Sequence, residues 1–122
     1  MKKLILILIL FSFSSAGLAE ENGIKHIVLC WLHQKNDMSA LEKVIETSKE
    51  LEMIPFVDSI AVGTALPSDR AVVDDSFDVG LVMNFKNQQD LAKYLIDEEH
   101  VKRVKTVMAP QCGKVLIYDV AY

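Results

Sequence analysis

The sequence lacks the short motifs that mark several common classes of enzyme. It contains no phosphate-binding P-loop, no glycine fingerprint of a dinucleotide-binding unit, no nucleophile elbow and no pair of cysteines separated by two residues. Nucleotide chemistry, serine hydrolysis and thiol-based redox catalysis therefore have no support in the sequence. Internal repeats are absent as well, so we expect one domain after the apolar N-terminus.

Positive charge is scarce in the part of the chain that we expect to remain after processing. Loss of residues 1–19 takes away Lys2 and Lys3, so that 11 of the 13 basic residues remain against 17 acidic ones and the net charge is −6. A domain with this charge has no electrostatic attraction to nucleic acid or to an anionic membrane surface. The sequence predicts that it binds neither.

The N-terminal segment is typical of a secretory signal peptide. A short basic start is followed by the run Leu4–Phe13, which contains a single polar residue, and Gly17 and Ala19 are the small residues that a signal peptidase requires. We expect cleavage after Ala19, which leaves residues 20–122 in the periplasm or outside the cell. An uncleaved membrane anchor is the alternative, but the apolar run is shorter than the roughly 20 residues that span a bilayer.

Only two cysteines are present, Cys30 and Cys112. An oxidising compartment permits a disulfide between them, and they can meet if the first and last strands of the domain are neighbours. The alternative is that both are small buried apolar residues. Neither thiol is assigned a catalytic role.

Hydrophobic periodicity and turn residues predict the order strand, helix, strand, strand, helix, strand. Ser39 and Glu42 have the form of a capping box before the first helix, and Asn87 is a suitable N-cap for the second. The predicted strands are 24–33, 57–65, 77–85 and 114–120, and the predicted helices are 39–53 and a two-part helix, 88–96 and 100–108. This order is that of the ferredoxin-like βαββαβ fold, an α+β fold whose four-stranded antiparallel sheet has helices on one face.

The first predicted strand is apolar on both faces. Since successive side chains of a strand point to opposite sides, one face carries His26, Val28, Cys30 and Leu32, and the other carries Ile27, Leu29, Trp31 and His33. A strand covered on both faces lies in the centre of its sheet, but a domain of this size has helices for one face only. We therefore expect Ile27, Leu29 and Trp31 to pack against a second copy of the chain, which gives a homodimeric α+β barrel.

Several short stretches form a recognisable combination. They are Lys25-His26-Ile27-Val28, Ile54-Pro55 with Val57 before a strand that ends in Gly63, the segment 70–78 with its Arg-x-Val-Val-Asp-x-Ser-aromatic-Asp pattern, and Tyr94 with His100. From Ile24 to about Tyr118 the chain resembles the stress-responsive dimeric α/β-barrel (Dabb) domain family, and it is identified as a secreted bacterial member. The resemblance implies a homodimer of ferredoxin-like subunits. It implies little about activity, because most members have no assigned reaction, although a plant member is a polyketide cyclase.

In that cyclase, a histidine of the first strand and a tyrosine and a histidine of the helical region line a pocket between sheet and helices. The resemblance places His26, Tyr94 and His100 at these positions. A histidine with a pKa near neutrality can remove a proton from carbon or oxygen, and a tyrosine hydroxyl can stabilise an oxyanion or enolate. The family often has His-Pro-x-His after the tyrosine, whereas this chain has Asp97-Glu98-Glu99-His100, so the expected pocket entrance is more acidic.

The same three residues also have structural interpretations. His26 is then a core histidine bonded to a backbone carbonyl, Tyr94 an ordinary amphipathic core residue, and His100 a helix cap. A metal site made of His26, His100 and Asp97 is a further alternative, but its spacing matches no established ligand pattern. We expect no metal and no cofactor.

Arg70 and Asp97 are the candidate ligand contacts outside this trio. Arg70 either pairs with Asp78 or with the second subunit, or acts as a lid residue for an anionic ligand.

Two hypotheses of function follow from the sequence. The protein is either a periplasmic dimer that binds a small organic ligand between sheet and helices, or a cofactor-independent lyase or cyclase that transfers protons on a polyketide-like or enolisable substrate. A cofactor-free monooxygenase is a third alternative.

Overall fold

The computed structural model describes residues 23–122 of the chain. The predicted signal peptide, residues 1–19, lies outside the described residues. No helix in the described part is long and apolar enough to cross a membrane. The elements are β1 (Ile24–Leu32), α1 (Met38–Glu50), the 3₁₀ turn η1 (Leu51–Met53), β2 (Ser59–Gly63), β3 (Val79–Phe85), α2 (Gln88–Leu95), α3 (Glu98–Arg103), the π-helical segment η2 (Val104–Met108), α4 (Ala109–Gln111) and β4 (Cys112–Ala121).

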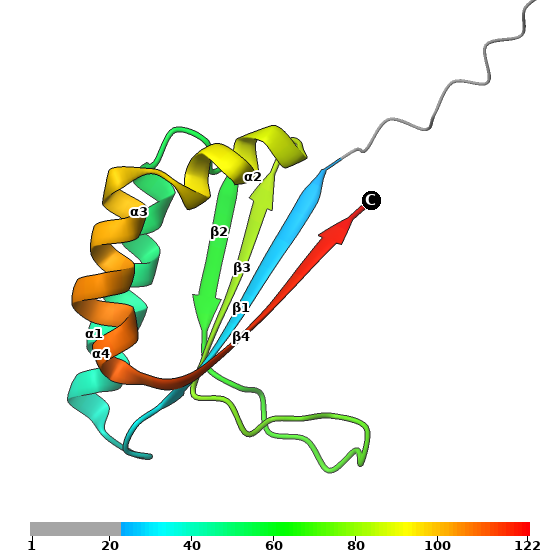
Figure 1. Ribbon diagram of the computed structural model, residues 1–122. Coiled ribbons are helices and arrows are strands. Elements are labelled where there is room, and N and C mark those ends of the chain that lie inside the picture. Colours follow the sequence, from blue (N-terminus) through cyan, green and yellow to red (C-terminus); the bar gives the residue numbers. More distant parts are fainter. Residues whose placement is uncertain (1–22) are drawn as a thin grey trace, which may run out of the picture.

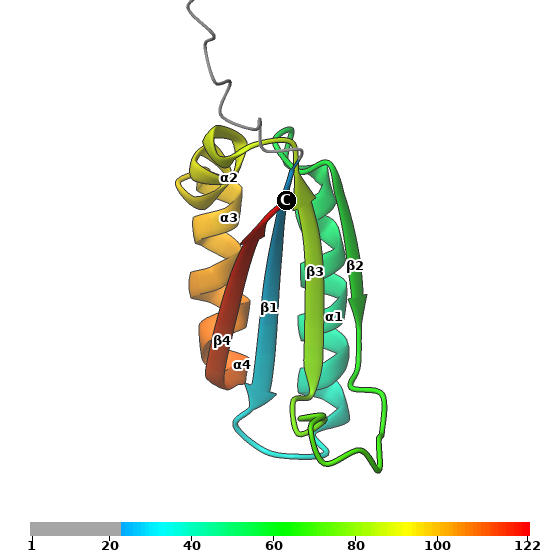
Figure 2. The same cartoon turned by 90° about the vertical axis from the view of Figure 1, so that its right-hand side faces the viewer.

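The four strands form one antiparallel sheet in the order β2-β3-β1-β4. All the helices lie on one side of it (Figure 1). Figure 2 looks onto the other side, where β4, β1, β3 and β2 follow one another with the helices behind them. The prediction of a ferredoxin-like α+β fold is confirmed, including the central position of the first strand and the contact between the first and last strands.

The core lies between the sheet and the helices. Along β1, alternate residues from Ile24 to Leu32 are buried beneath the helices, while Ile27, Leu29 and Trp31 on the other face stay partly exposed. Burial of each large apolar side chain contributes about 1.5–3 kcal/mol. The two faces of β1 therefore have different environments, and His26 belongs to the helix-covered face.

Helix α1 begins one residue earlier than the sequence predicts. Asp37, not Ser39, is its N-cap, and the Asp37 carboxylate accepts a hydrogen bond from the amide of Ala40 at 3.0 Å. Asn36, which precedes it, has a φ of 67°, a left-handed conformation that asparagine tolerates. That turn brings Asp37 to the helix end, so the predicted capping box of Ser39 and Glu42 is wrong. The predicted cap of α2 is confirmed, since Asn87 accepts from the amide of Asp90 at 2.8 Å.

The second helical region continues through Pro110 to Gln111, beyond its predicted end at residue 108. Asp97 caps α3, so the helix restarts at Glu98 rather than at His100. Pro110 has no amide hydrogen, and its ring would collide with the carbonyl four residues earlier in an α-helix. The chain avoids this by widening into the π-helical segment η2, after which the amide of Ala109 bonds to the carbonyl of Val104. The helix then runs on to Gln111, and β4 starts immediately.

A disulfide joins the first and last strands of the domain. Cys30 of β1 and Cys112 at the start of β4 are bonded, with their Cα atoms 5.6 Å apart and 82 residues apart in sequence. Both are buried. The two cysteines meet because the first and last strands are neighbours in the sheet.

The loop between β2 and β3 projects beyond the end of the sheet, to the side away from the helices (Figure 1). It returns through Ser76 and Phe77, and the indole Nε1–H of Trp31 donates to Ser76 Oγ at 3.0 Å. The Phe77 ring packs edge-on to Trp31 and lies over Gly80, where an added Cβ would come within 3.1 Å of it. Lys114 Nζ lies 4.4 Å from the centre of the Trp31 ring. Trp31 is therefore partly covered within its own chain.

Candidate functional site

A cavity of about 290 Å³ lies between the sheet and the second helical region. The strands β1, β3 and β4 form one wall, and η1, α2, α3 and η2 form the other. Among its described lining residues only Tyr94 and His100 have polar side chains; the rest are Val28, Leu51, Leu81, Leu95, Val104, Met108, Ala109, Val115 and Ile117. Val115 and Ile117 on the edge strand are 46% and 48% exposed, so the cavity is open to solvent along this edge.

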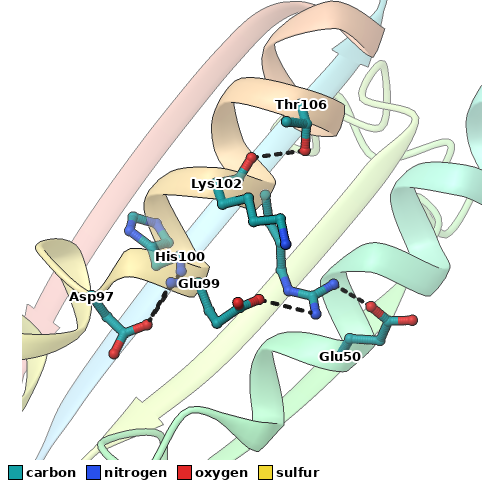
Figure 3. A network of polar contacts seen from close by, with 7 residues as sticks. Glu50, Asp97, Glu99, His100, Lys102 and Thr106 are labelled. Carbon is teal, nitrogen blue, oxygen red and sulfur yellow. Dashed lines mark hydrogen bonds and ion pairs between the residues drawn. The ribbon is translucent and has the colours of Figure 1, made fainter.

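The break between α2 and α3 sets the position of His100. α2 ends at Leu95, and the carboxylate of Asp97 accepts from the amides of Glu99 at 2.9 Å and His100 at 3.4 Å (Figure 3). His100 therefore stands in the first turn of α3. Its ring Nδ1–H donates to the carbonyl of Leu95 at 3.1 Å, one of the carbonyls that the end of α2 leaves without a helical partner.

Side-chain contacts stabilise the helical wall of the cavity. Arg103 of α3 forms an ion pair with Glu50 at the end of α1, and a second one at 3.5 Å with Glu99, one turn earlier (Figure 3). In the widened segment the hydroxyl of Thr106 donates to the carbonyl of Lys102 at 2.8 Å (Figure 3). The Arg103–Glu50 pair joins α3 to α1, whereas the other two contacts lie within the second helical region.

The structure brings together the three residues that the family resemblance singled out. Tyr94 is in the middle, with its ring centre 4.3 Å from that of His100 and 6.1 Å from that of His26. Phe85 packs against Tyr94 with a centre-to-centre distance of 5.1 Å. Tyr94 and His100 line the cavity, whereas His26 is 3% exposed and is not among the lining residues. His26 therefore stands behind Tyr94.

His26 has a partner that sequence reasoning missed. The Nδ1–H of its ring donates to a carboxylate oxygen of Asp119 on β4 at 2.5 Å, because the β1–β4 register places the two residues opposite each other. A carboxylate at Nδ1 fixes the tautomer and leaves Nε2 as the acceptor of the neutral ring. Antiparallel pairing of the first and last strands is the signal that could have identified this acid.

The environment keeps Tyr94 and His100 uncharged near neutral pH. Burial raises the pKa of the Tyr94 hydroxyl far above its ordinary value, and the negative charge of Asp97 adds to the effect. Burial lowers the pKa of His100, and nearby His26 lowers it further, against the opposing effects of the Leu95 carbonyl and Asp97. Tyr94 is thus a hydrogen-bond donor, and His100, protonated at Nδ1, has Nε2 free as an acceptor or base.

The two other ligand candidates lie elsewhere. Asp97 caps α3 and faces the groove beside Arg103 rather than the cavity. Arg70 is exposed on the loop before β3, where its amide donates to Ser68 Oγ at 3.2 Å. This loop lies beyond the far end of β1, about 20 Å from His26 at the usual rise of a strand. Within residues 23–122 no three His, Cys, Asp or Glu side chains cluster closely enough to hold a metal ion.

Comparison with known proteins gives relatives of the same fold. A curated stress-response A/B barrel domain-containing protein of Arabidopsis thaliana is 26% identical over 109 residues, which cover 89% of this chain and 40% of the relative. The chain thus spans less than half the length of that relative.

Two solved structures share the fold over most of both chains. A dimeric ferredoxin-like protein of unknown function from Thermobifida fusca is 22% identical, with 84% of this chain and 99% of that chain covered and a TM-score of 0.65. A hydroxynitrile lyase from Passiflora edulis is 20% identical, with 84% and 95% covered and a TM-score of 0.70. At these identities the similarity establishes the fold.

The family is established by a broader match. Residues 24–122 match the profile of the stress responsive A/B barrel domain, which covers β1 to β4 and all the residues of the cavity. The family prediction made from the strand and helix motifs is therefore confirmed, and the chain belongs to the stress-responsive A/B barrel (Dabb) domain family.

Proposed function

We propose that the protein binds a small, uncharged organic molecule in the cavity between sheet and helices. The observation that carries this proposal is the lining: apolar side chains surround one donor, the Tyr94 hydroxyl, and one acceptor, His100 Nε2. Small-molecule sites typically combine an apolar surface with a few polar groups that fix orientation. No charged side chain is among the described lining residues, so a carboxylate or an ammonium group would lose its hydration without compensation.

The test uses three compounds of one shape. 2-Naphthol carries a hydroxyl that both accepts and donates, naphthalene lacks it, and 2-naphthoate is an anion. We expect calorimetric or fluorescence titration to give the tightest binding for 2-naphthol and the weakest for 2-naphthoate. Tyr94→Phe removes one hydrogen bond, worth about 1 kcal/mol or roughly fivefold in affinity. Tyr118→Phe, on the other face of β4, is the matched control.

Tighter binding of 2-naphthoate than of 2-naphthol would refute the proposed preference for neutral ligands. Absence of binding by all three would refute the cavity as a site for ligands of this size. Equal losses in Tyr94→Phe and Tyr118→Phe would show that the loss does not come from the cavity hydroxyl.

We also propose that the chain acts as a homodimer in the periplasm or outside the cell. The uncovered face of the sheet supports the dimer, because it carries Ile27 and Leu29 of β1 beside Leu116 and Tyr118 of β4. Several bacterial proteins of this fold are described as dimeric. A buried disulfide supports the location, since such bonds persist in oxidising compartments. Trp31 contacts the loop between β2 and β3 of its own chain, and it remains a predicted interface residue.

A second candidate function is a cofactor-independent lyase. Two observations favour it: the neutral His100 with a free Nε2, and the buried His26 behind Tyr94 with its exposed partner Asp119. On a cyanohydrin, His100 Nε2 would take the hydroxyl proton while the Tyr94 hydroxyl donates to the same oxygen. The carbon–carbon bond to the nitrile then breaks, its electron pair leaves with cyanide, a carbonyl forms, and the proton returns to give hydrogen cyanide. The same groups suit an enolisable substrate, from which the base removes a proton on carbon.

Mandelonitrile tests this candidate, because its cleavage releases benzaldehyde with a strong ultraviolet absorbance. We expect cleavage above the buffer rate, a loss of about a hundredfold or more in His100→Ala, and no loss in His33→Ala, which replaces an exposed histidine outside the cavity. Cleavage at the buffer rate by the wild-type protein would refute cyanohydrin lyase activity and leave ligand binding as the function.

A further inference from the structure

The strand β4 is the least supported wall of the cavity. It is an edge strand, and all nine residues after Cys112 are exposed. Its backbone is held by β1 alone within the described residues. At its far end, Tyr122 and Gly23 exchange two backbone hydrogen bonds of 3.1 Å each. The near end is fixed by the disulfide between Cys112 and Cys30.

This strand supplies much of the candidate site. Val115 and Ile117 line the cavity, and Asp119 is the hydrogen-bond partner of His26. Met108 and Ala109, which come just before the disulfide, line the cavity from the helical side. Cys112 therefore sits at the corner where two walls of the cavity meet, next to the register shift between Trp31 and Leu32 in the β1–β4 pairing.

We propose that the Cys30–Cys112 disulfide is a redox switch for the cavity: the oxidised form holds β4 in place, and reduction frees β4 and weakens ligand binding. The functional consequence rests on the ligand binding proposed above. The structural consequence does not, because it concerns the order of β4 alone.

The reaction is an exchange with a dithiol reductant. One thiolate of the reductant attacks a sulfur of the disulfide and forms a mixed disulfide, and its second thiol displaces the protein cysteine. The protein gains two electrons and two protons as the thiols of Cys30 and Cys112, and the reductant becomes a disulfide. Cys30 is fully buried and Cys112 is 7% exposed, so attack requires the start of β4 to open.

Ligand binding and reduction should then oppose each other, because coupling between two sites is reciprocal. A ligand that packs against Val115, Ile117 and Met108 must leave before β4 opens. If only the closed form binds, the reduction rate falls by the factor one plus the ratio of ligand concentration to Kd. At ten times Kd this is a decrease of about tenfold.

The first experiment follows hydrogen exchange in the purified protein before and after reduction with dithiothreitol. We expect exchange of β4 amides from Val115 to Asp119 to accelerate more than exchange of β3 amides, because β3 is joined to β1 on the opposite side and loses only the protection that follows from the lower stability of the whole domain. Unchanged exchange in β4, or equal acceleration in β4 and β3, would overturn the proposal. The Cys30→Ala/Cys112→Ala variant should show the fast β4 exchange with and without dithiothreitol, which excludes a direct effect of the reductant.

The second experiment measures 2-naphthol affinity in both redox states and the reduction rate with and without 2-naphthol. We expect affinity to fall about fivefold or more on reduction, within the usual range of coupling between sites, and reduction to slow in the presence of the ligand. Equal affinities in the two states would overturn the switch while leaving ligand binding intact. Absence of binding to the oxidised protein would refute the proposed function instead, and the exchange experiment would still decide whether the disulfide orders β4.

Discussion

Removal of the disulfide should lower the stability of the whole domain by several kcal/mol. The bond joins residues 82 apart in sequence, and cross-linking a loop of that length restricts the unfolded chain by about 4.5 kcal/mol at 25 °C in the chain-entropy model. Removal of native disulfides from small secreted domains typically costs about 2–5 kcal/mol. The free energy of unfolding of such a domain falls by about 1–3 kcal/mol per molar urea. A loss of about 4.5 kcal/mol should therefore lower the urea midpoint by roughly 1.5–4.5 M.

The assay compares urea unfolding of the oxidised protein, the reduced protein and Cys30→Ala/Cys112→Ala at one protein concentration, because a dimer's stability depends on concentration. The Ser48→Ala variant is the control for loss of a small buried group. Ser48 is fully buried and its hydroxyl donates only to Met108 Sδ, at 3.7 Å, so this change should cost less than about 1.5 kcal/mol. A loss on reduction no larger than that of Ser48→Ala would refute the loop-closure reasoning.

Three further outcomes are expected. Leu116→Arg on the uncovered sheet face should halve the mass seen by light scattering and Ile117→Arg on the other face should not; equal masses would contradict the proposed interface. N-terminal sequencing of the exported protein should begin at Glu20, and a Met start would contradict cleavage. Burial lowers the pKa of His100 in the folded state, so the unfolded chain binds the proton first as the pH falls. The free energy of unfolding should therefore be unaffected by His100 above the unfolded pKa of about 6.5, and it should decrease as the pH drops from there through the lower folded value. His100→Gln should weaken that fall in urea midpoints while His33→Gln keeps it.

The fold was predictable because local signals agreed with one another. The alternating apolar pattern of β1, the Asn87 cap and the order of elements all favoured one topology. The errors concern where helices begin and end. Asp37 takes the cap that Ser39 was expected to provide, and the chain accommodates Pro110 by widening the helix rather than ending it. Both choices depend on backbone geometry that residue type alone does not fix.

The candidate site was predictable in its aromatic members and not in its shape. Family resemblance singled out His26, Tyr94 and His100, which do lie together. The resemblance did not indicate that His26 stands behind Tyr94 with Asp119 as its partner, because that pairing depends on the register between β1 and β4. The apolar lining from η2 depends on the π-helical turn, which sequence periodicity assigns to an ordinary helix.

The alternation of residues along β1 and β4 separates the two proposed properties of the protein. On β1, Val28 lines the cavity while the neighbouring Ile27 and Leu29 lie on the uncovered face, and on β4 the cavity residue Ile117 adjoins Leu116 in the same way. A substitution on one face leaves the side chains of the other in place, because the strand period is two. Ligand affinity and dimer mass should therefore respond to different residues of the same strands. The disulfide is the exception: it anchors the backbone of β4, which both faces share, so its reduction should weaken the dimer as well as the cavity.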